Sequence, residues 1–223
     1  MAQTVHRLPG GQEIRVVQQL LAEEEDAEDD LPAFFFAAES LAASTGCKVW
    51  ESASLLLAVL HARPQLVADR SVLELGSGTG LGGLACAVLG AGRVTLSDLA
   101  SVVAYHTEPS MHANPALAER VSCLTLDWTD FRIETVPPCN VVIASDCVWL
   151  REYLDPFVNC LDAIMRRNSD CVAIIAQTER ATEHSKTFAS SKDLIGRLEA
   201  RHYQLEVLES KEAMCVYRVT MKN

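Results

Sequence analysis

The chain has 223 residues, which is enough for one sizeable hydrophobic core, and we expect one domain rather than two. It carries 19 Lys and Arg against 30 Asp and Glu, a net charge of −11, which argues against general binding of nucleic acids or other phosphates. Its eight cysteines include no C-x-x-C pair, so we expect free thiols in a reducing compartment and no zinc site. No apolar stretch is long enough to cross a bilayer. We therefore expect a soluble protein of the cytoplasm or nucleus.

The first 45 residues are predicted to form an extension ahead of the main domain, residues 46–223. A turn at Leu8–Gly11 is followed by alternating residues from Glu13, a pattern that predicts a β-hairpin. Residues 23–30 are acids interrupted only by Ala27. We interpret them as a solvated loop, with attraction for a basic partner as the alternative. Residues 31–36 are apolar and predict another short strand.

The main domain alternates between strand and helix patterns. An apolar helix is predicted from near Glu51 to before Pro64. Regular alternation in an apolar chain favours an α/β fold, a parallel sheet covered on both faces. The last two strands, separated by a polar turn at residues 209–212, predict a C-terminal hairpin with an antiparallel strand. The predicted strands lie near 71–75, 93–97, 121–126, 139–145, 170–176, 203–208 and 214–221, and the predicted helices near 80–90, 100–113, 153–167 and 187–201.

The chain is organised around residues 71–80, which read as a strand, a glycine turn and the start of a helix. Glycines let the backbone bend sharply and approach a ligand, and the helix start offers unpaired N–H groups. Asp98 ends the next predicted strand, 20 residues after Gly78. A carboxylate there can accept hydrogen bonds from both ribose hydroxyls. The stretch predicts a nucleoside cofactor, with a ligand-free glycine turn as the alternative.

Two registers of the glycines lead to different cofactors. Gly78, Gly80 and Gly83 satisfy the dinucleotide fingerprint G-x-G-x-x-G. The other register, Glu74-x-Gly76-x-Gly78-x-Gly80, starts at Gly76, has Glu74 two residues before it, and makes Gly80 a further cofactor-binding candidate. An acid at that position would repel a pyrophosphate and suits a sulfonium cofactor with an ammonium group. We favour the second register, and NAD is the alternative ligand.

Ligands of open α/β sheets sit beyond the carboxyl ends of the strands, so the residues there are the candidates. Asp127 could accept from an adenine amino group, and Trp128 could supply an apolar plane. The alternatives are that Asp127 caps a turn and that Trp128 plugs the end of the sheet. Trp50 is expected either to contact the cofactor or to be a core aromatic. The candidates at the first four strand ends are Gly76, Ser77, Gly78, Asp98, Leu99, Asp127, Trp128, Ser145 and Asp146.

Asp146 stands at the end of the apolar run Val141–Ser145, where a carboxylate costs free energy unless it has a partner. A cationic amine would be that partner. We predict that Asp146 attracts the amine of an acceptor and aims it at the group to be transferred. The alternative is a cap for the helix beginning near Glu152, or a turn acid.

These residues together resemble the small protein-lysine methyltransferases of the seven-β-strand class, which includes enzymes acting on chaperones, translation elongation factors and calmodulin. The resemblance implies a Rossmann-like class I fold, a seven-stranded and mostly parallel sheet with an antiparallel last strand. It also implies S-adenosylmethionine as cofactor, S-adenosylhomocysteine as product and an unidentified protein as substrate. It implies that Trp50, Gly76 to Gly78, Asp98, Trp128 and Ser145 line the cofactor pocket. The motifs that carry it are Gly46-x-x-x-Trp50, Leu73–Gly82, Ser97-Asp98-Leu, Asn114, Asp127-Trp128 and Ala144-Ser-Asp146-Cys-Val-Trp149.

The chain departs from the family's Asp-x-x-Tyr motif, because Trp149 stands where the tyrosine would be. The hydroxyl is lost, while an aromatic wall for a lysine channel is kept. Tyr153 is expected near the mouth of that channel. Two alternatives stay open: a methyltransferase for another acceptor, histidine or a small amine, and a non-catalytic cofactor-binding subunit. We expect a monomer without nucleic-acid or membrane partners.

Overall fold

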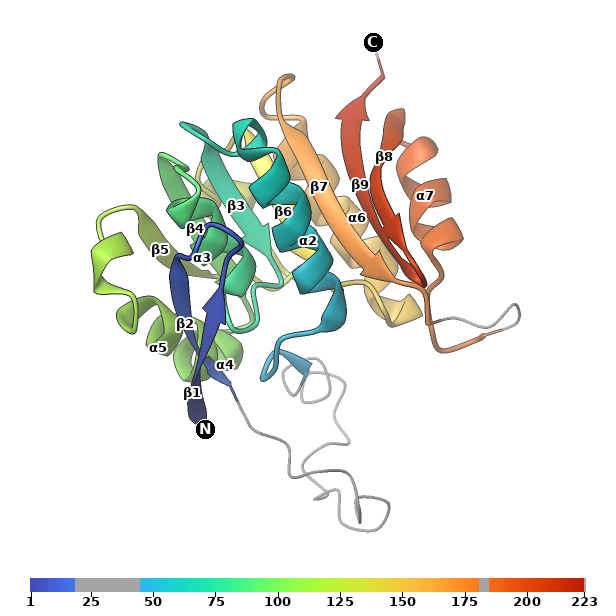
Figure 1. Ribbon diagram of the computed structural model, residues 1–223. Coiled ribbons are helices and arrows are strands. Elements are labelled where there is room, and N and C mark those ends of the chain that lie inside the picture. The colour runs from blue at the N-terminus through green and yellow to red at the C-terminus, as the bar shows by residue number, and fades with distance from the viewer. Residues whose placement is uncertain (19–44, 181–184, 223) are drawn as a thin grey trace.

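The computed structural model describes residues 1–18, 45–180 and 185–222. The predicted acidic loop at 23–30 and the predicted strand at 31–36 lie outside these ranges. The main domain is a seven-stranded sheet in the order β5-β4-β3-β6-β7-β9-β8 (Figure 1). The strands are β3 (Ser71–Leu75), β4 (Arg93–Asp98), β5 (Val121–Thr125), β6 (Val141–Ser145), β7 (Val172–Thr178), β8 (Tyr203–Lys211) and β9 (Met214–Met221).

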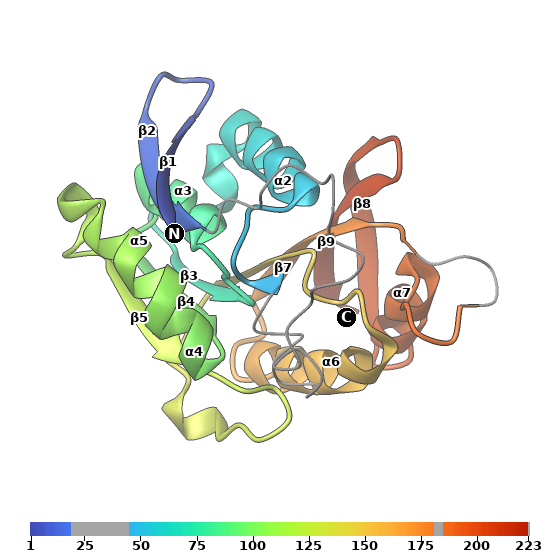
Figure 2. The ribbon, with the colours of Figure 1, turned by 90° about the horizontal axis from the view of Figure 1, so that it is seen from below.

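Strands β3 to β7 pair in parallel, and β9 is antiparallel to both β7 and β8. This confirms the predicted class I architecture. Helices α2 (Glu51–Ala62) and α3 (Leu81–Val88) cover one face, and α6 (Arg151–Met165) and α7 (Ser191–Glu199) cover the other (Figure 2). The short helical segments are η2 (Pro64–Leu66), α4 (Ala100–Val102), the π-helical η3 (Val103–Thr107), α5 (Glu108–His112), η4 (Pro115–Leu117) and η5 (Ile133–Thr135).

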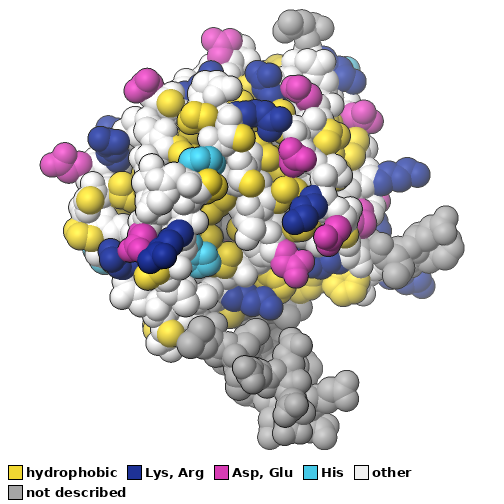
Figure 3. All heavy atoms as spheres, viewed as in Figure 1, with side chains coloured by type: hydrophobic (Ala, Val, Ile, Leu, Met, Phe, Trp, Pro, Cys, Tyr) yellow, Lys and Arg dark blue, Asp and Glu magenta, His cyan; other side chains and the backbone are white. Residues whose placement is uncertain are grey.

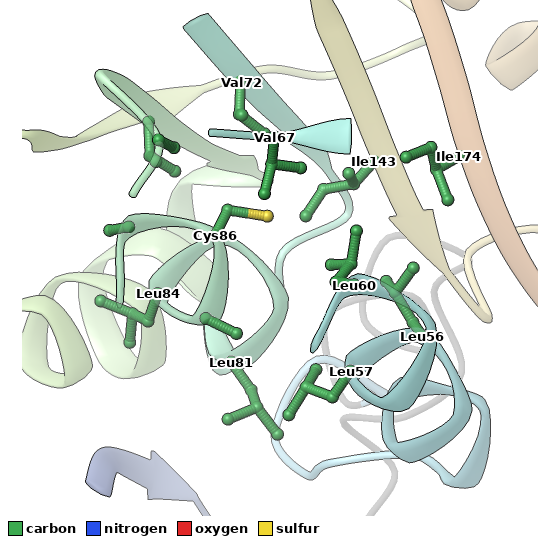
Figure 4. Close-up of a cluster of buried hydrophobic side chains, with 14 of the residues drawn as sticks. Leu56, Leu57, Leu60, Val67, Val72, Leu81, Leu84, Cys86, Ile143 and Ile174 are labelled. Atoms are coloured by element: carbon green, nitrogen blue, oxygen red, sulfur yellow. The ribbon is translucent and has the colours of Figure 1, made fainter. Parts of the chain in front are cut away.

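Alternate residues of the central strands enter two separate apolar layers, which explains why the strands read as continuous apolar runs. Val72 and Ile143 pack toward α2 and α3, whereas Leu73 and Val142 pack toward α6. Figure 4 shows the first layer, in which side chains of both helices meet those of the sheet. The side chains labelled there are Leu56, Leu57, Leu60, Val67, Val72, Leu81, Leu84, Cys86, Ile143 and Ile174, all of them buried.

Three predicted elements differ in detail. The helix predicted over 100–113 is interrupted by the π-helical turn η3 just before Pro109, which has no N–H to donate. The helix predicted from 187 begins at Ser191, because Ser190 and Asp193 form a capping box there. Strand β8 extends to Lys211, into the predicted turn, since an edge strand leaves its polar side chains in water.

The predicted N-terminal hairpin is confirmed as β1 (Ala2–Arg7) and β2 (Glu13–Gln18). Asn114 joins it to the main domain, accepting from Arg15 N at 3.0 Å and donating to Arg15 O at 2.6 Å. Gln18 Oε1 accepts from Val49 N at 3.1 Å, so β2 also contacts the segment that leads into α2. The hairpin therefore braces that segment.

Acidic and basic side chains are interspersed on the face seen in Figure 3. Seven of the 30 acidic residues lie within 23–30, so that short segment holds much of the excess negative charge. All eight cysteines have free thiols, as expected. Among the helices of the described residues, none is both long and apolar enough to span a membrane.

Candidate functional site

One cavity lies beyond the carboxyl ends of β3, β4, β5 and β6, beside the start of α2. With its open mouth included, it encloses about 980 Å³. The structure brings almost all predicted site residues to its wall. Those that line it are Trp50, Glu74, Gly76, Ser77, Gly78, Asp98, Leu99, Asp127, Trp128, Ser145, Asp146, Trp149 and Tyr153.

The glycine turn is shaped by close packing. Gly76 and Gly78 have φ of +63° and +52°, in the left-handed region that favours glycine. A Cβ on Gly76 would lie 2.7 Å from Cys147 Sγ, and one on Gly78 would lie 3.1 Å from Gly46 O. Gly80, predicted to bind the cofactor, does not line the cavity and is the N-cap residue of α3.

Glu74 is a buried acid, 3% exposed, that lines the cavity from within β3. Its Oε2 accepts from Gly83 N at 2.9 Å, in the first turn of α3. Because the N-cap Gly80 has no side chain, Glu74 caps this helix from across the turn. Burial raises the pKa of Glu74 to about 8. Its predicted preference for a cofactor bearing an ammonium group stays a prediction.

Asp98 stands at the end of β4, where the sequence predicts a ribose-binding acid. Its Oδ2 accepts from Gly78 N at 2.7 Å and its Oδ1 from Leu99 N at 2.8 Å. Burial raises the pKa of Asp98 to about 6, although both N–H bonds oppose that rise. The carboxylate lies against the glycine turn, and its remaining lone pairs can accept from hydroxyl groups.

Asp127 and Trp128 differ in how they meet the cavity. Asp127 Oδ1 accepts from the backbone N and the hydroxyl of Thr129, at 2.8 and 2.7 Å, so Asp127 caps a turn as the alternative interpretation expected. Trp128 packs edge-on against Phe157, with ring centroids 5.2 Å apart. Its buried Nε1 has no hydrogen-bond partner among the described residues. A buried N–H of this kind normally has a partner, so its lack of one is a feature that a bound ligand could explain.

Asp146 has a cationic partner within the chain, Arg180, whereas the sequence analysis expected the amine of an acceptor in that place. The guanidinium meets both carboxylate oxygens, at 3.0 and 3.1 Å, and the Asp146 side chain is 2% exposed. Thr178 donates to the same carboxylate from its backbone N at 2.8 Å and from its hydroxyl at 3.1 Å. Burial raises the pKa of Asp146, but Arg180 outweighs it and holds the pKa below its ordinary value.

Asp146 also meets a helix, but not the helix that the sequence suggested. The N-cap of α6 is Leu150, with no side-chain cap, so the interpretation of Asp146 as a cap for that helix is wrong. Asp146 Oδ2 instead accepts from Ser52 N at 3.4 Å, in the first turn of α2. The carboxylate therefore joins the ends of β6 and β7 to the start of α2.

Three aromatic side chains contribute to the cavity wall around this carboxylate. Trp50 donates from Nε1 to Thr45 O at 2.8 Å, and Arg180 lies over its ring at 5.3 Å. Trp149 packs against Phe188 with ring centroids 6.1 Å apart. Tyr153, in the first turn of α6, also lines the cavity, and its place at the mouth of a lysine channel stays a prediction.

The sequence analysis missed residues that hold this wall together. Arg180 and Thr178 stand at or just after the end of β7, and the rule applied to four strand ends would have found them at the fifth. Thr107 Oγ1 donates to Gly78 O at 2.8 Å, and Lys48 Nζ lies 4.1 Å from the Trp50 ring centroid. No pattern in the sequence pointed to either. Within the described parts of the chain, no cluster of three or more His, Cys, Asp or Glu could hold a metal ion.

Comparison with known proteins places this geometry in a family. The lysine methyltransferase family matches residues 33–193, which is more than half of the chain. Protein-lysine N-methyltransferase rrg1 of Schizosaccharomyces pombe is 34% identical over 113 residues, which are 47% of this chain and 37% of that protein. Protein-lysine N-methyltransferase EFM3 of Chaetomium thermophilum is 28% identical over 68% of this chain and 48% of its own. The calmodulin-lysine N-methyltransferase of Arabidopsis thaliana is 23% identical over 74% and 56%.

The chain thus spans about half the length of these curated relatives. Among solved structures, an O-methyltransferase family protein from Burkholderia thailandensis superposes with a TM-score of 0.63 at 12% identity, covering 82% of this chain and 59% of that one. The DhpI complex with SAH has a TM-score of 0.54 at 19% identity, over 77% and 85%. At such identities the likeness concerns the fold.

Proposed function

Because the chain belongs to the lysine methyltransferase family, we propose that it transfers a methyl group from S-adenosylmethionine to the side-chain nitrogen of a lysine in a partner protein. The names of its relatives support this acceptor, since all three described above are protein-lysine or calmodulin-lysine methyltransferases. Structural neighbours that bind SAH support the donor. The observation that carries the proposal is the Asp98 carboxylate, set against the Gly76–Gly78 turn in the wall of the cavity.

The residues present fit this cofactor. S-Adenosylmethionine, when bound, supplies an activated methyl group on a sulfonium centre. Asp98 would accept hydrogen bonds from the ribose hydroxyls, and the indole of Trp128 would offer an apolar face and its unpartnered N–H.

The acceptor side of the cavity is aromatic. Trp149 and Tyr153 line it, and aromatic faces attract cations such as a lysine ammonium. The amine must lose its proton to water before it can attack, and most of the rate gain comes from positioning it. The net charge of −11 suits a basic segment of the partner. Direct orientation of the amine by Asp146 stays a prediction, and it requires that the amine displace a bond from Arg180.

Methyl transfer from labelled cofactor tests the proposal. The chain is incubated with S-adenosylmethionine carrying a deuterated methyl group and with the proteins of a cell extract, and the protein fraction is then hydrolysed. We expect deuterated methyl-lysine above the level of the extract alone, and clearly less of it with Asp98→Ala. Label in histidine, or label only in the small molecules of the extract, would mean that the acceptor is not lysine. Trp149, in place of the family's tyrosine, leaves those acceptors open. No label, despite binding of S-adenosylhomocysteine, would mean a non-catalytic subunit.

Other properties stay predictions from the sequence: location in the cytoplasm or nucleus, a monomeric state, the division of the chain near residue 45, and the lack of nucleic-acid or membrane partners.

A further inference from the structure

The ion pair of Asp146 and Arg180 lies beside Trp50, and no step of the proposed reaction uses Arg180. We propose that Arg180 is a positioning residue, held by both oxygens of Asp146, which in turn holds the indole of Trp50 in the wall of the cavity. In this proposal Asp146 acts on the site through Arg180 and the start of α2, which replaces the prediction from the sequence that it orients the acceptor amine directly.

The bonds at Asp146 leave little room for an incoming ammonium. Its two oxygens accept two bonds from the Arg180 guanidinium, two from Thr178 and one from Ser52 N. A carboxylate offers about four lone-pair sites, so these are filled. The Asp146 side chain is 2% exposed, against 27% for Arg180. The carboxylate is therefore almost closed to solvent, while part of the guanidinium stays exposed.

Two contacts link Asp146 to Trp50, one through Arg180 and one through the first turn of α2. The guanidinium carbon of Arg180 lies over the indole, 5.3 Å from the ring centroid, a distance at which a cation attracts an aromatic face. Trp50 is also the N-cap residue of α2, and Asp146 accepts from the N–H of Ser52, two residues later. The hydroxyls of Ser52 and Ser145, 2.8 Å apart, tie the same turn to the end of β6.

Trp50 faces the cavity, whereas Arg180 is not among the described residues that line it. Arg180 is thus placed to act through the indole. Lys48 lies over the same ring at 4.1 Å, but among the described residues no carboxylate is bonded to its ammonium group. The planar fork of arginine matches both carboxylate oxygens at once, which a lysine ammonium cannot do.

The position of the indole can be measured directly by ¹⁹F NMR. The chain has three tryptophans, so 5-fluorotryptophan labelling gives three resonances, with Trp128 and Trp149 as internal controls. We expect Arg180→Gln and Asp146→Asn to shift or broaden the Trp50 resonance and to leave the other two unchanged. Asn is chosen because it tolerates the left-handed φ of +52° at Asp146. The matched control is Arg197→Gln, which breaks an exposed pair with Asp155, and neither residue of that pair lines the cavity.

Cofactor affinity provides the functional readout, and only this part rests on the proposed function. Arg180→Gln is expected to weaken S-adenosylhomocysteine binding about tenfold, and Arg180→Lys, which keeps the charge without the fork, about threefold. Because Asp146 acts through Arg180, the double variant Asp146→Asn with Arg180→Gln should bind no more weakly than the weaker single variant.

Either of two results would overturn the inference. One is an unchanged Trp50 resonance in Arg180→Gln. The other is opposite effects of the two single variants, with Arg180→Gln raising and Asp146→Asn lowering methylation of lysine, which would mean that Arg180 competes with the amine for Asp146. If the wild-type chain binds no S-adenosylhomocysteine, the proposed function fails, and the NMR experiment still decides the role of Arg180.

Discussion

Replacing Glu74 by Gln is expected to flatten the dependence of stability on pH. Burial raises the pKa of Glu74 from 4.5 to about 8. Between these values the folded chain keeps a proton that the unfolded chain releases, so the free energy of unfolding falls as the pH rises. The free-energy cost of ionising Glu74 in the folded chain is absent below pH 4.5 and complete above pH 8. Glutamine is neutral throughout, and its side-chain oxygen can still accept from Gly83 N, which lies 2.9 Å from the Glu74 carboxylate.

The size of this effect follows from the shift. At about 1.4 kcal/mol for each pKa unit, raising the pKa from 4.5 to about 8 costs on the order of 5 kcal/mol at high pH. That is a large share of the stability of a typical domain, about 5–15 kcal/mol. Urea unfolding followed by circular dichroism at about pH 5, 7 and 8.5 would measure it. The variant should match the wild type at the lowest pH and exceed it by several kcal/mol at the highest. The exposed Glu199→Gln is the control, and equal pH dependence in wild type and Glu74→Gln would refute the reasoning.

Three further predictions concern the cofactor site and α3, the helix that follows the glycine turn. Asp98→Ala should weaken binding of S-adenosylhomocysteine by on the order of 2 kcal/mol through loss of a charged acceptor, and unchanged affinity in calorimetry would count against the site. Because burial raises the pKa of Asp98 to about 6, affinity should fall as the pH drops through that value, since the protonated carboxyl loses acceptor capacity; a flat profile in the wild type would contradict this role. Gly83→Ala should destabilise the fold by about 1–3 kcal/mol, since its Cβ would meet Leu96 and lie 2.9 Å from Glu74 Oε2. Gly196→Ala, with open space in α7, should instead stabilise it by about 1 kcal/mol, and equal effects in thermal unfolding would disprove the steric argument.

The sheet could be predicted because its signal is local. Apolar strands that alternate with helical patterns predict a parallel sheet. The glycines and Asp98 mark the strand ends that form the cavity. The final hairpin was equally readable, but its length was not, because an edge strand accepts polar residues such as those at 209–211. The period of the apolar residues and the spacing of the motifs therefore predict which elements are present better than they predict where each element ends.

The partners of the buried acids could not be predicted in the same way. Asp146 meets Arg180, 34 residues later, because the pairing of Ser145 with Ala176 brings the ends of β6 and β7 together. Glu74 meets the N–H of Gly83 across the turn, which depends on the direction in which α3 leaves the strand. The sequence marked Asp146 as costly to bury, whereas Glu74 was interpreted only through the charge of the cofactor. Only three-dimensional register reveals that each caps a helix.

The most direct test of the account is isothermal titration of the purified chain with S-adenosylhomocysteine, run beside NAD. Its central claim is that the cavity beyond β3, β4, β5 and β6 binds an S-adenosylmethionine-type cofactor through the glycine turn and Asp98. The account predicts saturable binding of S-adenosylhomocysteine and none of NAD. Binding of NAD alone would contradict it, because the glycines would then serve a dinucleotide and the methyltransferase proposal would fall with that register.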